Sequence, residues 1–227
     1  MSEKNRSKKH LNLQKAYNLS SPEDNINFYR GWAEDYDADF ALGMDYILPY
    51  QVASKFIKLK GSGPVLDIGA GTGLLGIEMQ KLNKFEIHAT DISEEMLSVA
   101  EKKGIYSKSI VGDLTKGLPI KDNSYNGIVS SGTFTHGHVG PEVLFEIKRI
   151  LSKGGVAVLS VNSKHWHSLG FDATLQTLEA SGSKINVTEV NIYGQKCKSD
   201  SKNDTAYLLI CKVILQIIHL LQHFQLI

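Results

Sequence analysis

The chain lacks the features that would cross-link it, carry it across a membrane or attract it to a polyanion. It has two cysteines in 227 residues, too few for a disulfide framework or a cysteine-based zinc site and typical of a reducing compartment. Lysine and arginine number 25 against 24 acidic residues, so the charge balance gives no indication of nucleic acid as a partner. The basic N-terminus has no apolar run behind it, which argues against a signal peptide. We therefore expect a cytoplasmic protein.

The two ends of the chain differ in composition from its middle. Residues 1–25 are polar and basic and predict a flexible lead, whereas residues 26–212 are long enough for one domain with a substantial core. Residues 213–227 carry no formal charge, but a membrane-spanning helix needs about 20 apolar residues. We interpret this apolar tail as a divergent end without a catalytic role. The alternative is an oligomer or membrane-surface contact, because an exposed apolar patch favours association.

Short apolar runs alternate with longer amphipathic runs through the middle of the chain. This alternation predicts βαβ units and a parallel sheet. The last two strands have no helix between them and should form an antiparallel pair at one edge. We expect strands at 64–68, 86–90, 107–111, 125–131, 155–161, 185–193 and 205–212, and helices at 73–83, 93–103, 141–152 and 170–181.

The most informative segment is residues 64–73, Pro-Val-Leu-Asp-Ile-Gly-Ala-Gly-Thr-Gly. A short apolar strand runs into Gly69, Gly71 and Gly73, and a helix-like run follows at once. Glycine has no Cβ, so the backbone can turn sharply and a ligand can lie directly against it. The helix then presents unpaired N–H groups to a negative group. The segment predicts a cradle for a nucleotide or nucleoside.

Two ligand classes compete for this cradle. Gly71-x-Gly73-x-x-Gly76 satisfies the dinucleotide pattern, and Asp91 lies about 20 residues further on, where an NAD ribose carboxylate would sit. Against NAD, Asp67 interrupts the strand at a position that dinucleotide folds usually keep apolar. An NAD(P)-dependent oxidoreductase stays open as an alternative.

The order of the motifs resembles the class I S-adenosylmethionine (SAM) methyltransferases. An acidic first strand, a glycine loop, a carboxylate after the second strand and a Gly-Asp pair at 112–113 follow one another. Segments 29–37 and 131–141 also resemble the Williams–Beuren syndrome region methyltransferase-like family, and the similarity covers roughly residues 25–212. The resemblance implies an α/β, Rossmann-like seven-stranded sheet, mostly parallel with an antiparallel edge strand and helices on both faces. It also implies SAM as cofactor and methyl transfer to a nucleophile.

The acceptor of the methyl group is not specified by the sequence. The nearly neutral charge favours a small molecule over protein or nucleic acid. No general catalytic motif such as Asn-Pro-Pro-Tyr follows the fourth strand. A SAM-binding protein without turnover is therefore the second alternative.

The resemblance also assigns cofactor-binding roles to individual residues. The glycine loop and Asp67 would hold the methionyl part, Asp91 the ribose hydroxyls and Asp113 the adenine amino group. Asp91 has a competing role as the cap of the following helix, although Ser93 could provide that cap instead. The expected set is Tyr36, Asp67, Gly69, Ala70, Gly71, Gly73, Asp91, Ile92, Met96, Asp113, Leu114, Ser130 and Ser131.

Two His-x-His pairs follow consecutive strands, at His136 and His138 and at His165 and His167. His136 or His138 is our candidate catalytic base, because imidazole titrates near neutral pH. A structural role in a rigid, glycine-flanked loop explains these two residues equally well. No carboxylate or cysteine accompanies the pairs at ligand spacing, so we expect no metal site.

Overall fold

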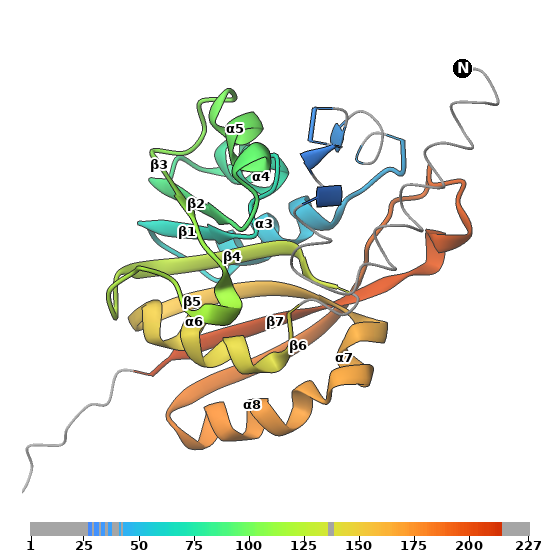
Figure 1. The fold of residues 1–227 in the computed structure, drawn as a ribbon. Coiled ribbons are helices and arrows are strands. Elements are labelled where there is room, and N and C mark those ends of the chain that lie inside the picture. The colour runs from blue at the N-terminus through green and yellow to red at the C-terminus, as the bar shows by residue number, and fades with distance from the viewer. Residues whose placement is uncertain are drawn as a thin grey trace, which may run out of the picture.

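A computed structural model describes most of the chain (Figure 1). Several sequence predictions lie outside the described residues, namely the flexible lead, nearly all of the apolar tail, and the candidate bases His136 and His138. The described residues are 27–28, 30–31, 33–34, 36–37, 41, 43–135 and 139–214.

The described residues form one sheet of seven strands in the order β3-β2-β1-β4-β5-β7-β6. Strands β1 to β5 pair in parallel, and β7 runs antiparallel to both β5 and β6. The predicted α/β fold with an antiparallel pair at one edge is confirmed; β6 takes the edge, and β7, one place in, is the reversed strand. The strands are β1 (Val65–Ile68), β2 (Ile87–Asp91), β3 (Lys108–Val111), β4 (Tyr125–Phe134), β5 (Leu151–Asn162), β6 (Ser183–Asn191) and β7 (Thr205–Val213).

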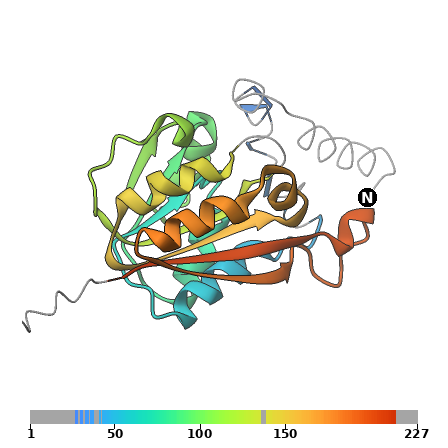
Figure 2. The same cartoon turned by 90° about the horizontal axis from the view of Figure 1, so that it is seen from below.

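Helices cover both faces of the sheet, as expected (Figures 1 and 2). One face packs against α3 (Leu48–Lys58), α4 (Leu74–Leu82) and α5 (Glu94–Glu101). The other packs against α6 (Leu144–Ile150), α7 (Ser163–Leu169) and α8 (Phe171–Ala180). Within the part of the chain that the structure describes, no helix is both long and apolar enough to cross a membrane.

The main differences from the sequence prediction lie on either side of β5. The predicted helix 141–152 is shorter, because β5 already begins at Leu151, which pairs with Tyr125 before the register shifts. A separate helix, α7, precedes the one predicted at 170–181. It begins where Asn162 Oδ1 accepts hydrogen bonds from the backbone N–H groups of Lys164 and His165, a typical N-cap.

The central strand β1 positions the glycine loop. All four of its residues are buried, as expected for a strand covered on both faces. Leu66 and Ile68 pack into the core on the α6 side, and Val65 packs on the α3 side. The glycine loop follows directly at the carboxyl end of β1, which is the edge where open α/β sheets bind their ligands.

Candidate active site

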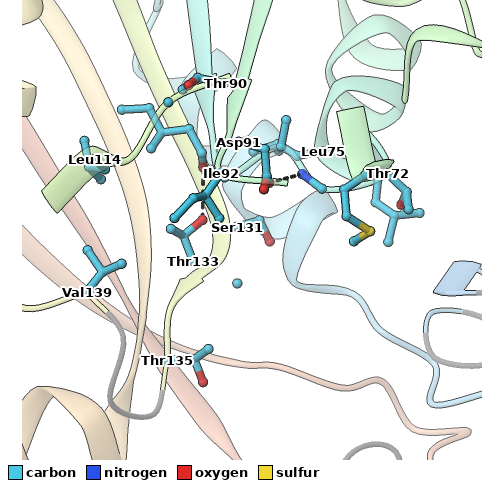
Figure 3. A pocket seen from close by; sticks show the side chains of 18 of the residues that line it. Thr72, Leu75, Thr90, Asp91, Ile92, Leu114, Ser131, Thr133, Thr135 and Val139 are labelled. Carbon is cyan, nitrogen blue, oxygen red and sulfur yellow. Dashed lines mark hydrogen bonds between the residues drawn. The ribbon is translucent and has the colours of Figure 1, made fainter. Parts of the chain in front are cut away.

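A cavity opens at the carboxyl ends of β1, β2 and β4 (Figure 3). Most of the residues expected to bind the cofactor line it, and only Asp67, Gly73 and Ser130 do not. The sequence prediction missed several other lining residues, including Tyr46, Thr72, Thr133, Thr135 and Val139. The expected residues on the wall are Tyr36, Gly69, Ala70, Gly71, Asp91, Ile92, Met96, Asp113, Leu114 and Ser131.

The glycine turn presents its backbone to the cavity. Gly69 and Gly71 have φ angles of 65° and 53°, a region that other residues rarely adopt. A Cβ on Gly69 would also collide with the side chain of Thr133. The N–H groups of Gly69 and Ala70 donate to the carbonyl of Thr90 at 2.8 and 3.0 Å, which ties the turn to β2.

Asp91 lies at the end of β2, and each carboxylate oxygen accepts one backbone hydrogen bond. Oδ2 accepts from the N–H of Gly71 at 2.8 Å (Figure 3). Oδ1 accepts from the N–H of Ser93 at 2.9 Å. Ser93, not Asp91, is the N-cap of α5, since its hydroxyl accepts from Met96 N–H. A carboxylate oxygen has a second lone pair, so both oxygens can still accept hydroxyl protons from a ligand. Burial raises the pKa of Asp91, and the hydrogen bonds from Ser93 and Gly71 oppose that rise.

Asp113 lies on the cavity wall at the start of a short 3₁₀ turn. Its Oδ1 accepts from Thr115 N–H at 2.9 Å and from Thr115 Oγ1 at 2.6 Å. Lys116 Nζ is 3.1 Å from its other oxygen. Burial raises the pKa of Asp113, but the hydrogen bonds from Thr115 and Lys116 outweigh it, so the net pKa is lowered. Asp113 is thus a preorganised carboxylate beside the apolar side chain of Leu114.

Three expected site residues lie behind the cavity wall. Asp67 is fully buried beneath the glycine turn, where its Oδ2 accepts a hydrogen bond from Tyr106 at 2.7 Å. Gly73 is the N-cap of α4, and Ser130 donates to the carbonyl of Ile68 at 2.7 Å. The sequence could not place the side chains of Asp67 and Ser130, because the contacts that hold them come from distant segments. They support the wall from behind and do not form its surface.

Asp67 has an unusual environment for a carboxylate. Its Oδ1 is buried without a hydrogen-bond partner among the described residues. Burial raises the pKa of Asp67 to about 7, opposed by the hydrogen bond from Tyr106 and assisted by the negative charge of Asp91. Tyr106 precedes β3 and packs below Gly73 and Gly76. No sequence pattern indicated its role.

Hydroxyl groups gather at the β4 end of the cavity. Tyr46 Oη lies 3.3 Å from Ser131 Oγ, and Thr133 and Thr135 line the wall beside them (Figure 3). Tyr46 lies close to Gly132, where an added Cβ would come within 2.9 Å of its hydroxyl. The candidate bases His136 and His138 follow Thr135 in the sequence but are outside the described residues.

The second histidine pair lies on α7. His165 is buried, and its Nε2 is 2.8 Å from the carbonyl of Val139. His167 Nε2 is 3.4 Å from the hydroxyl of Tyr207. Across the described ranges, no group of three or more His, Cys, Asp or Glu side chains is arranged to hold a metal ion. Both histidines of this pair therefore contact other residues of the fold.

Comparison with known proteins shows that this chain is similar to methyltransferases. A methyltransferase domain model matches residues 65–155. Methyltransferase-like protein 27 of Homo sapiens is 26% identical over 179 residues, covering 75% of this chain and 72% of that protein. Demethylmenaquinone methyltransferase of Thermotoga maritima is 31% identical over 131 residues, and the chain spans 56% of its length. The domain match includes the glycine turn, Asp91 and Asp113.

Solved structures share the fold. The DhpI complex with S-adenosylhomocysteine (SAH) superposes with a TM-score of 0.59 at 20% identity, covering 83% of this chain and 95% of that one. Phosphoethanolamine N-methyltransferase 2 of Haemonchus contortus, in complex with phosphomonomethylethanolamine and SAH, gives a TM-score of 0.61 at 15% identity. It covers 85% of this chain and 59% of that one. Together with the domain match, these findings favour SAM over a dinucleotide. The domain match and these relatives support a class I SAM-dependent methyltransferase with SAM as its cofactor.

Proposed function

We propose that this methyltransferase transfers the methyl group of SAM to a small-molecule nucleophile, and that Asp91 holds the ribose of the cofactor. The observation that carries this proposal is the carboxylate at the tip of β2. Its two oxygens are fixed by Gly71 and Ser93, and each keeps a lone pair for a hydroxyl. Two adjacent hydroxyls on one ribose match such a carboxylate.

The other cofactor contacts follow from the residues on the wall. The backbone of Gly69, Ala70 and Gly71 would approach the methionyl part, because these positions leave the turn open to the cavity. Asp113 would accept a hydrogen bond from the adenine amino group. The apolar side chains of Ile92, Met96 and Leu114 would pack against the adenine ring, and Tyr36 would lie over the sulfonium, which an aromatic face attracts.

SAM supplies an activated methyl group when it is bound, so the protein must chiefly bind and align the two reactants. The end of the cavity beside Ser131 and Tyr46 is our proposed acceptor site. Its described hydroxyl groups can orient a polar acceptor, and the nearly neutral chain gives no indication of a polyanionic substrate. His136 and His138 are the proposed bases, since they follow the lining residue Thr135 in the sequence.

Calorimetric titration tests the cofactor assignment. We expect wild-type protein to bind SAM and SAH but not NADH, and Asp91→Asn to weaken SAH binding by about 100-fold, because two charge-assisted hydrogen bonds are lost. Glu94→Gln is the matched control: Glu94 is also acidic and in the first turn of α5, but it is exposed and does not line the cavity. Equal SAH affinity in the two variants would contradict the ribose role.

Incubation with labelled SAM and a metabolite extract tests turnover. Transfer of label to a low-molecular-weight product supports the proposed substrate class. Tight SAH binding with no labelled product would favour the alternative, a SAM-binding protein without turnover.

A further inference from the structure

Three ion pairs connect the described residues before α3 to α5 and the turn that follows it. Two of these pairs are exposed, with side-chain exposures between 37% and 78%. Such pairs contribute little to stability. In the third, the lysine and aspartate side chains are only 22% and 33% exposed. The pairs are Arg30–Glu95 at 2.6 Å, Glu34–Lys102 at 3.0 Å and Asp37–Lys103 at 2.5 Å.

The third pair contacts the glycine turn directly. Asp37 Oδ1 accepts a hydrogen bond from Thr72 Oγ1 at 2.5 Å, and its Oδ2 accepts one from Lys103 Nζ. Lys103 also donates to the main-chain carbonyl of Thr72 at 2.5 Å. Thr72 is therefore held through its side chain and its backbone by two charged residues far away in the sequence.

Thr72 occupies a critical place in the cofactor cavity. It is 1% exposed, lines the cavity and lies between Gly71, which donates to Asp91, and Gly73, the N-cap of α4. Tyr36, the residue before Asp37, lines the same cavity. A restraint on Thr72 thus acts on the backbone that is proposed to receive the methionyl part.

We propose that Asp37 and Lys103 are positioning residues that hold the glycine turn in its cofactor-binding conformation by fixing Thr72. A turn rich in glycine has many alternative conformations, so fixing it in one of them costs conformational entropy. The Asp37–Thr72–Lys103 cluster orders the turn when the protein folds, so cofactor binding does not have to order it. The inference rests on the proposed role of the glycine turn in binding the cofactor.

Neighbouring lysines provide a matched test. Lys103→Met removes the contacts to Asp37 and Thr72, whereas Lys102→Met removes only the exposed pair with Glu34. We expect the dissociation constant of SAH, measured by calorimetry, to rise about tenfold in Lys103→Met and to stay within about twofold of wild type in Lys102→Met. Equal affinities in the two variants would overturn the proposal.

Three further variants test whether Asp37 and Lys103 act together through Thr72. Asp37→Asn should weaken SAH binding to a similar degree, and adding it to Lys103→Met should cause little further loss, because both act through Thr72. Lys103→Arg should restore most of the affinity. Additive losses, or a Lys103→Arg variant as weak as Lys103→Met, would overturn the proposal. If wild-type protein itself fails to bind SAH, the cofactor assignment fails instead, so the two failures are distinguishable.

Discussion

The buried carboxylate of Asp67 predicts a measurable dependence of stability on pH. Its pKa is raised from an ordinary 3.8 to about 7 by burial. The folded state therefore binds a proton more tightly than the unfolded state. Through this group, stability is highest in acid, falls as the pH rises from 3.8 towards 7, and is fully lost above that value. Between about pH 5 and about pH 9 the loss amounts to about 3 kcal/mol.

Asp67→Asn removes this titration. Asparagine keeps an oxygen that can accept the hydrogen bond from Tyr106, but it carries no charge at any pH in this window. Burying its unpaired amide costs about 1–3 kcal/mol, and that cost is the same at every pH. The difference in unfolding free energy between wild type and variant should therefore shift by about 3 kcal/mol in favour of the variant between about pH 5 and about pH 9.

Urea denaturation of both proteins across this range, followed by circular dichroism, measures the difference. Groups that do not interact with Asp67 titrate alike in both proteins and cancel in the comparison. If the difference in unfolding free energy is independent of pH, then Asp67 is ionised in the folded state throughout, and the reasoning from burial is wrong. A difference that moves in favour of wild type as the pH rises would refute it as well.

Two more predictions concern the glycine turn and the residues that contact it. Gly69→Ala should lower the unfolding free energy, measured in urea, by about 2–4 kcal/mol, because the added Cβ is strained at a positive φ and also collides with Thr133. Gly104→Ala is the control, since Gly104 has the same φ of 65° and nothing within 4 Å, and it should lose only about 1 kcal/mol. Equal losses would show that the contact with Thr133 is harmless. Tyr106→Phe removes the hydroxyl that donates to Asp67. It should lower the unfolding free energy by about 1–3 kcal/mol near pH 9, where Asp67 is ionised, and by less near pH 5. A larger loss at pH 5 would contradict the raised pKa of Asp67.

The local patterns of the sequence predicted most of the fold, and the resemblance to the class I methyltransferases supplied the list of candidate cofactor residues. Alternating runs of strand and helix length predicted the parallel sheet, because each element must bury one face against its neighbours. The glycines predicted the turn, since the backbone at Gly69 requires a residue without a Cβ. The position of Asp91 after the second strand placed it at the edge where the cavity lies. The helix α7 was missed, although Asn162 is a typical N-cap.

The sequence by itself determined most of the strands and helices and which residues lie at the carboxyl ends of the strands. Both depend on neighbouring residues in the chain. Only the tertiary structure decided which side chains meet across that edge. Asp67 accepts a hydrogen bond from Tyr106 and does not line the cavity, and Tyr46 contacts Ser131 from 85 residues away. Residues so far apart leave no common periodicity, and they meet only when the packing of the sheet and helices brings their segments together.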